Sequence, residues 1–313
     1  MTCLITGASG FIGSRLLRPS DRALVRKFEG MHGSIAGDLL DLRSLEIACK
    51  GMQTVIHCAG YAHAFTASDA NAHWKINFKG TCNILKASAK SGVKHFIFLS
   101  SVKAMADPHD SCVDENWLGE PVTPYGLSKL AAEAAVLEAS KNYDLEVTNL
   151  RLAMVYGNGG HGNLERMARA IQLGWFPPIP ETQNRRSIVH VEDVVRLIHM
   201  LQDRRPVIAN GKTYIVADLK AYSGREIYDA IRRSLGKSSI KWSVPRGLLK
   251  TGSFLGDQLE SLLHRPVPFN SEIFNRLLGS ACYSASKIQE ELGWKAQIGL
   301  REGIQEMLGS HCV

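Results

Sequence analysis

The sequence predicts an α/β fold with a doubly wound parallel sheet, because short apolar runs alternate with helical patterns along its first half. Runs that are apolar nearly throughout are expected for strands covered by helices on both faces. The predicted strands are Cys3–Thr6, Ala23–Arg26, Thr54–Cys58, Phe96–Ser100 and Glu146–Leu150. Between them, Asn77–Ala89 and Ser128–Glu138 carry apolar residues at helical spacing, and Thr123 or Ser128 is expected to contribute to the start of the second helix.

Size and composition exclude several other classes of protein. The 313 residues suffice for one large domain or two modest ones, and 45% hydrophobic with 21% charged residues fits neither a disordered chain nor a coiled coil. The 37 Lys and Arg exceed the 30 Asp and Glu, which gives a formal charge of +7. The basic residues are interleaved with acidic ones, so we expect no nucleic-acid partner, whereas an anionic small ligand fits.

A glycine-rich loop follows the first predicted strand and opens a helix, in the pattern G-x-x-G-x-x-G. Glycines let the backbone approach a pyrophosphate, and the N–H groups at a helix start hold the anion. The pattern therefore predicts a Rossmann-type dinucleotide site, with cofactor contacts from Gly7, Ser9, Gly10, Phe11, Ile12 and Gly13. Nine residues, interrupted by Pro19, separate this loop from the next strand, so its helix must be short.

Two cations, Arg26 and Lys27, stand at the end of the second predicted strand, where a carboxylate would bind the adenosine ribose of NAD. Cations there suit a 2′-phosphate and predict NADP. NAD remains the alternative if the two side chains are merely solvated. Asp38 and Leu39 are expected near the adenine. At the end of the third predicted strand, the backbone of Cys58, Ala59 and Gly60 is expected to pass close to the cofactor.

The alternation of strand-like and helical patterns stops near Tyr156, where a loop rich in Gly and Asn is followed by a Pro-rich stretch. We expect a dinucleotide-binding domain at 1–156. A strand at Ser187–Val191, a helix at Glu192–Leu201 and a strand at Thr213–Val216 should return residues 187–216 to it. Residues 157–186 and 217–313 then form a smaller, interleaved substrate-binding region.

Three residues form a candidate catalytic set. Tyr125 and Lys129 lie four residues apart on one helix face, and Ser100 and Ser101 end a predicted strand upstream, where open α/β sheets place ligand sites. Lys129 can stabilise the phenolate of Tyr125 and hydrogen-bond the nicotinamide ribose. Ser101 can hold the substrate oxygen, and Ser100 is expected beside the cofactor. A Tyr–Lys pair alone is weak evidence, because about 0.4 such pairs per chain arise by chance.

The seven cysteines predict neither a disulfide framework nor a metal site, because their number is odd and no C-x-x-C pair occurs. We interpret them as reduced thiols of a cytoplasmic protein. They are Cys3, Cys49, Cys58, Cys82, Cys112, Cys282 and Cys312. Neither an export signal nor an apolar segment long enough to span a bilayer is visible, so no membrane partner is expected.

Over nearly its whole length the chain resembles the extended short-chain dehydrogenases/reductases of the nucleotide-sugar epimerase/dehydratase family. Ile76-Asn77-Phe78-Lys79-Gly80-Thr81 resembles the family's V-N-x-x-G-T segment, which implies that Asn77 supports the cofactor site. The resemblance also implies a UDP-sugar substrate and, by analogy, a homodimer. It assigns nucleotide-sugar contacts to Asn163, Leu164, Arg186 and, less securely, Arg276. The role of His161 stays open.

The residues after Ser101 narrow the chemistry that the resemblance implies. Dehydratases of this family have Asp-Glu there, whereas this chain has Val102 and Lys103, which argues against elimination of water. Lys103 also replaces the Cys of GDP-sugar epimerase-reductases and is expected to contact substrate. We therefore expect chemistry at C4. Reduction of a UDP-4-keto-6-deoxy-N-acetylhexosamine for surface polysaccharide synthesis is preferred, a UDP-sugar 4-epimerase with retained NAD is the alternative, and a catalytically inactive dinucleotide-binding regulator is the option of another class.

Overall fold

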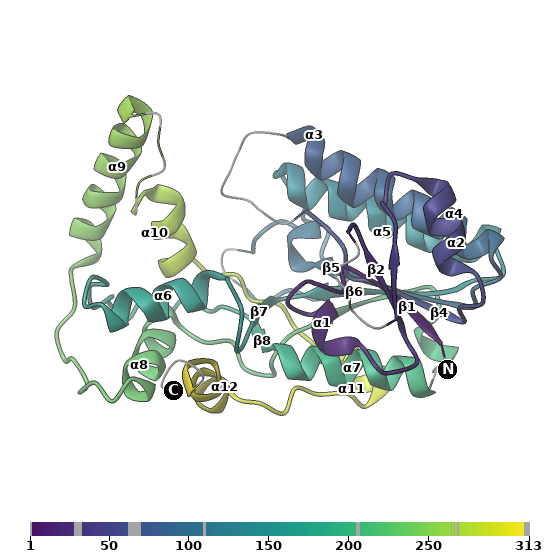
Figure 1. Ribbon diagram of the computed structural model, residues 1–313. Helices are drawn as coiled ribbons and strands as arrows, with labels where there is room; N and C mark the ends of the chain where they lie inside the picture. The colour runs from purple at the N-terminus through teal and green to yellow at the C-terminus, as the bar shows by residue number, and fades with distance from the viewer. Residues whose placement is uncertain are drawn as a thin grey trace.

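The computed structural model describes residues 2–27, 33–61, 70–108, 111–204, 207–263, 265, 267 and 269–309. Its centre is a seven-stranded sheet in the order β3-β2-β1-β4-β5-β6-β9, in which all neighbouring strands are parallel (Figure 1). The doubly wound prediction is confirmed. The strands are β1 Cys3–Thr6, β2 Arg22–Val25, β3 Ser34–Ala36, β4 Thr54–His57, β5 His95–Ser101, β6 Glu146–Leu152 and β9 Lys212–Val216.

Helices cover both faces of the sheet, as Figure 1 shows. Alternate strand residues point to opposite faces, so Phe96 and Phe98 of β5 join one hydrophobic cluster while Ile97 and Leu99 join the other. Burial of each such side chain stabilises the fold by about 1.5–3 kcal/mol. The first cluster lies under α2 (Leu42–Cys49), α4 (Gly80–Lys90) and α5 (Pro124–Asn142), and the second under α1 (Gly13–Leu16), α7 (Val191–Arg204) and α11 (Ser286–Leu292).

The helix starts follow from local chemistry. The helix α1 has only four residues, as the short spacing before β2 predicted. The helix α5 begins at Pro124, because the Thr123 hydroxyl accepts a hydrogen bond from the Gly126 N–H and Pro is well suited to a first turn. Of the two residues proposed for this start, Thr123 is therefore the cap. The predicted helix at Asn77–Ala89 divides into a π-helical turn, η1 (Trp74–Lys79), and α4.

The second half of the chain builds a separate hydrophobic cluster. Its helices are α6 (Asn163–Gln172), α8 (Gly224–Ser234), α10 (Ser271–Leu278) and α12 (Leu300–Gly309), and α9 (Arg246–Leu263) extends beyond them (Figure 1). Shorter elements are α3 (Ala70–His73), η2 (Val102–Ala104) and η3 (Val207–Ala209). The proposed domain boundaries stay a prediction.

The expectation that Ser187–Val191 rejoins the main sheet is wrong. Strand β8 (Ile188–His190) pairs with β7 (Met154–Tyr156) in a two-stranded sheet of their own. Strand β9 takes the place beside β6, along the whole register from Thr148 to Leu152. Of the two strands expected to join the main sheet in this part of the chain, only β9 does so.

The expectation of reduced thiols is wrong for one pair, because a disulfide joins Cys112 to Cys282. The two lie 170 residues apart in sequence, and a short parallel bridge between Val113 and Tyr283 brings them together. Such a contact follows from the fold and leaves no spacing pattern. Cys3, Cys49, Cys58 and Cys82 are free thiols, and Cys312 lies outside the described residues. Since cytosolic disulfides are rare, the cysteines no longer support a cytoplasmic location, which stays a prediction.

Candidate functional site

The glycine-rich loop passes close to the turn that follows β4. Gly7 adopts a φ of +68°, and a Cβ built on it would lie 2.7 Å from the backbone nitrogen of Ala59. A Cβ on Gly13 would collide with the carbonyl of Gly7. Only glycine fits these two positions, so the sequence pattern reflects a close approach between two backbone segments. The loop and the turn both follow adjacent strands at the same edge of the sheet.

A chain of buried hydrogen bonds fixes that turn. The Thr81 hydroxyl donates to the Asn77 carbonyl (2.6 Å), so it accepts from His57 Nε2 (2.9 Å). His57 Nδ1 then accepts from the Thr6 hydroxyl (2.7 Å), whose oxygen accepts from the Ala59 N–H (3.1 Å). Burial and the charge of Lys129 lower the pKa of His57 to about 3, so the ring is neutral. This role is not predictable from the sequence, since a buried histidine has no pattern of its own.

Asn77 links the π-helical turn to α5. Its side-chain oxygen accepts from the Tyr61 N–H (2.6 Å), and its amide nitrogen donates to the Tyr61 carbonyl and to the Ser128 hydroxyl, both at 3.1 Å. The Ser128 hydroxyl donates to the Tyr125 carbonyl (2.8 Å). Asn77 is 1% exposed, and π-helical turns occur often at functional sites.

Lys129 lies between the sheet and the turn after β4. Its ammonium donates to the Leu99 carbonyl (2.8 Å) and lies 4.6 Å from the centre of the Phe98 ring. A Cβ built on Gly60 would be 3.5 Å from that nitrogen. Burial lowers the pKa of Lys129 to about 8, against the attraction of Glu133. The amine can therefore change charge near neutral pH.

Tyr125 lies one helical turn before Lys129. Burial raises the pKa of its phenol, and a hydrogen bond with the Ser101 hydroxyl acts in the opposite direction. The His73 and Tyr125 rings pack in a T-shaped arrangement, with 5.8 Å between centroids. The structure thus brings Tyr125 and Ser101 together. The expectation that Lys129 lowers the pKa of Tyr125 differs from the net direction found, because burial dominates.

The two serines that end β5 face opposite ways. Ser100 donates to the Glu133 carboxylate (2.5 Å), which also binds the Arg151 guanidinium, at 2.7 Å to Nη2. The Ser101 oxygen accepts from the Lys103 N–H (3.1 Å), at the start of η2. The hydroxyl of Ser100 is therefore hydrogen-bonded to this ion pair. Its place in the sequence had instead suggested a position beside the cofactor.

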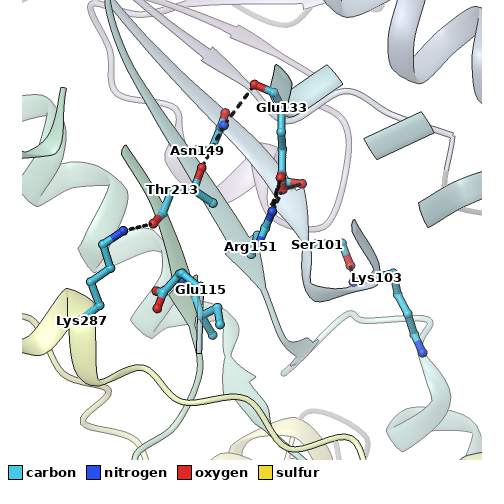
Figure 2. A network of polar contacts seen from close by, with 10 residues as sticks. Ser101, Lys103, Glu115, Glu133, Asn149, Arg151, Thr213 and Lys287 are labelled. Carbon is cyan, nitrogen blue, oxygen red and sulfur yellow. Dashed lines mark hydrogen bonds and ion pairs between the residues drawn. The ribbon is translucent and has the colours of Figure 1, made fainter. Parts of the chain in front are cut away.

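Glu133 continues the stripe of Tyr125 and Lys129 by one more turn of α5. Figure 2 shows its carboxylate against Arg151, while its backbone carbonyl accepts from the Asn149 amide (3.3 Å). That amide also donates to Thr213 of β9 (3.2 Å). The network joins α5 to three strands. The sequence analysis missed Glu133, although the four-residue spacing beyond Lys129 could have indicated it.

The residues proposed for the adenosine end lie at the surface. Thr6 pairs with Leu24, so Arg26 follows β2 at the same edge of the sheet as the glycine-rich loop. Arg26, Lys27 and Asp38 are exposed, and the Asp38 carboxylate accepts from the Leu40 N–H (2.8 Å). Leu39 is half-buried against Gly80 of α4.

Arg186 and Arg276, two of the residues proposed to bind the nucleotide, lie close enough for their charges to interact. Burial lowers the pKa of Arg186, and the charge of Arg276 lowers it further, whereas Asp107 opposes both. The Arg186 guanidinium donates to the Gly279 carbonyl (2.8 Å). Asp107 accepts from the Tyr283 hydroxyl (2.9 Å) and pairs with the Lys103 ammonium (2.6 Å). Asp107 and Tyr283 were not found from the sequence, because they meet only in the fold.

The remaining proposed substrate residues open α6. Asn163 is exposed at the first position of that helix. Leu164 is 3% exposed, and its side chain belongs to the hydrophobic cluster of the second half. Any contact of Leu164 with a ligand would therefore use its backbone. His161, in the preceding loop, is exposed.

The described part of the chain offers neither a candidate metal site nor a candidate membrane-spanning helix. No three His, Cys, Asp or Glu side chains in it are grouped to hold a metal ion. Within the same residues, no helix is both long and apolar enough to cross a bilayer.

Comparison with known proteins gives consistent matches. Residues 3–217 match the model of the NAD dependent epimerase/dehydratase family. A UDP-glucose 4-epimerase of Vibrio cholerae is 30% identical, over 97% of this chain and 93% of that protein. An Escherichia coli O157:H7 protein, N-acetyl-alpha-D-glucosaminyl-diphospho-ditrans,octacis-undecaprenol 4-epimerase, is 27% identical over the same shares.

A solved structure agrees with these relatives. MoeE5 in complex with UDP-glucose and NAD has a TM-score of 0.76 and 25% identity, over 99% of this chain and 98% of that one. The matched family model covers the glycine-rich loop, Ser101, Tyr125 and Lys129. This chain therefore belongs to the NAD dependent epimerase/dehydratase family of nucleotide-sugar enzymes.

Proposed function

We propose that the protein is a 4-epimerase that inverts the C4 hydroxyl of a UDP-sugar. The observation that carries the proposal is that two relatives matched over 97% of the chain are both 4-epimerases. The sequence analysis preferred a reductase, and these relatives favour its alternative. Val102 and Lys103 argue against a dehydratase, because Val102 has no titratable group and the Lys103 ammonium is paired with Asp107, so the two do not replace an Asp–Glu pair.

NAD is the cofactor that this reaction requires, and the described residues fit it. The loop at Gly7 and Gly13 lacks side chains where a Cβ would block the backbone, as a pyrophosphate site needs. Bound NAD would accept hydride from C4 and return it to the opposite face. Asn77 and His57 hold the turn against which the cofactor would lie, and Lys129 would bind the nicotinamide ribose.

Tyr125 is proposed as the acid and base. Burial keeps its phenol protonated at neutral pH, ready to donate to a keto oxygen at C4. Removal of the C4 hydroxyl proton requires the phenolate, which the Ser101 hydroxyl stabilises by hydrogen bonding. A charged Lys129 would add to this by attraction. Ser101 would also hold the substrate oxygen beside Tyr125.

Arg186 and Arg276 are proposed to bind the diphosphate, since two guanidinium groups offer paired donors to adjacent anionic groups. The two relatives differ in what carries the sugar, UDP in one and diphospho-undecaprenol in the other, and a diphosphate is common to both. A diphosphate would compete with Asp107 for Arg186. UDP remains the proposed carrier.

We expect Tyr125→Phe to abolish epimerisation while the chain stays folded, because the change removes only the hydroxyl. Purified protein is incubated with UDP-glucose and the formation of UDP-galactose is followed by chromatography. The initial rate should fall by at least about a hundredfold, the lower end for a positioned acid or base. Tyr143→Phe, at the exposed end of the same helix, is the matched control and should keep the wild-type rate. A variant at Tyr125 with most of its activity would contradict the assignment.

The Gly7→Ala variant is expected to lose dinucleotide binding, because its Cβ would push the glycine-rich loop away from Ala59. Gly51→Ala is the control: Gly51 also has a positive φ, +76°, but a Cβ there meets nothing within 4 Å. Both variants carry the same backbone strain, on the order of 1 kcal/mol. Titration with NAD, followed by protein fluorescence, should show binding only in the control. Equal affinity in both variants would remove Gly7 from the cofactor site.

Arg186→Ala should weaken binding of UDP by about 1.5–3 kcal/mol, the range for a hydrogen bond to a charged group. Arg185→Ala is a close control, because the neighbouring arginine is exposed. Isothermal titration of each variant with UDP alone separates nucleotide binding from catalysis. If Arg186→Ala and Arg185→Ala bind UDP equally well, Arg186 does not contact the diphosphate.

A 4-ketoreductase that uses NADPH is the second candidate, and Arg26 with Lys27 favours it. Both cations are exposed where a 2′-phosphate would lie. A reductase consumes NADPH in stoichiometric amounts when a UDP-4-keto-6-deoxy-hexosamine is supplied. An epimerase interconverts its sugars without added cofactor and without net change in nicotinamide absorbance. The two assays therefore distinguish the candidates directly.

Arg26→Asp tests the cofactor preference. If Arg26 binds a 2′-phosphate, the new carboxylate should repel it and shift the ratio of NADPH to NADH affinity by at least about tenfold toward NADH. Arg43→Asp on α2 makes the same charge change at another exposed position and should leave the ratio unaltered. An unchanged ratio in Arg26→Asp would show that Arg26 only faces solvent, and would favour NAD.

A further inference from the structure

The helix α9 presents a row of leucines to solvent. Its apolar stripe, defined here as five leucines that are each 50% to 77% exposed, covers about 100° of the helix surface at 100° per residue. These residues are Leu248, Leu255, Leu259, Leu262 and Leu263. Single exposed leucines are ordinary, but five in one helical stripe mark an interaction surface.

The rest of α9 explains why the stripe faces outward. Ser253 is buried, and Gly256 packs so closely on the Phe269 carbonyl that a Cβ would collide with it. Asp257 and Glu260 hold the start of α10, through the Ser271 hydroxyl and the Asn270 amide. One side of the helix is thereby fixed to the protein, and the stripe lies beside it.

Charge around the stripe is positive. Between residues 241 and 265 the Lys and Arg side chains are Lys241, Arg246, Lys250 and Arg265, all of them exposed, and the middle two belong to α9. The two acidic side chains in this span, Asp257 and Glu260, are bonded to α10 and keep their charge, so the Lys, Arg, Asp and Glu of the span sum to +2. Trp242, 63% exposed, precedes the helix. A leucine face with basic residues on the polar side and an aromatic residue at the end is the composition of a helix that lies in a bilayer interface.

We propose that α9 docks this protein on an anionic lipid bilayer, with the leucine stripe in the headgroup–acyl boundary and the basic residues toward lipid phosphates. A second copy on the same surface would carry the same net charge of +2 in this span and be repelled, whereas an anionic bilayer complements that charge. The helix would lie on the membrane without crossing it. This proposal departs from the expectation of no membrane partner, which rested on the lack of spanning segments and export signals in the sequence.

The position of α9 would bring a docked bilayer close to the proposed diphosphate site. It holds the first turn of α10, and the last turn of α10 carries Arg276, whose charge acts on Arg186 (Figure 1). The bilayer surface would thus lie one helix away from the proposed diphosphate site. This inference goes beyond the proposed epimerase and does not depend on it.

The test is co-sedimentation of the full chain with vesicles of phosphatidylcholine and phosphatidylglycerol at 3:1, compared with pure phosphatidylcholine. We expect binding to the mixed vesicles, at least about tenfold weaker binding to the neutral ones, and loss of the difference in concentrated salt. Leu255→Glu with Leu262→Glu should weaken binding to the mixed vesicles by at least about tenfold. Ile47→Glu with Val207→Glu, at exposed apolar positions on α2 and η3, is the matched control and should bind like the wild type.

Thermal unfolding and UDP titration check that the variants fold. The proposal is overturned if the wild type does not bind the mixed vesicles, or if the α9 and control variants bind them equally. It is also overturned if sedimentation shows a wild-type dimer that only the α9 variant dissociates and that does not bind lipid, since a second copy would then cover the stripe. Vesicle binding is measured without substrate, so its failure leaves the epimerase proposal standing, and an inactive enzyme leaves docking untouched.

Discussion

The buried ion pair between Glu133 and Arg151 is the contact on which the candidate site depends. It joins α5 to β6, and the hydroxyl of Ser100 ties β5 to the same carboxylate. Glu133 is 3% exposed, so the pair is desolvated and loss of one partner would leave a buried charge at a cost of about 3–5 kcal/mol. Because Tyr125 and Lys129 lie on the same helical stripe, the pair fixes their distance from the end of β5.

A second set of contacts fixes the other wall of the site. Neutral His57 bridges Thr6 of β1 and Thr81 of α4, so the turn after β4 is held from two sides. Its burial makes protonation costly, and the nearby ammonium of Lys129 adds to that cost. One uncharged ring thus lets a cation lie close by without repulsion. A charged histidine in that place would displace the amine that the proposed chemistry requires.

Local patterns in the sequence were enough to predict most strands of the main sheet, the glycine-rich loop and the short first helix, and to limit the start of α5 to Thr123 or Ser128. They were enough because each depends on residues close in sequence. The partners of Ser100, the pair Asp107–Tyr283 and the Cys112–Cys282 disulfide join segments from 33 to 176 residues apart, and no spacing rule reaches that far. Strand β8 was assigned to the wrong sheet for a similar reason, since an apolar run does not tell which neighbour it will pair with.

The disulfide closes residues 112–282 into a covalent ring. Tyr125, Lys129, Arg186 and Arg276 all lie inside it, whereas the glycine-rich loop is outside. A single break of the backbone anywhere in the ring, for instance in the exposed stretch before α9, would leave every one of these residues in the same molecule. Reduction would then remove the last covalent link between the two pieces. The connection between the proposed acid–base helix and the arginine site is therefore doubled, once along the chain and once through sulfur.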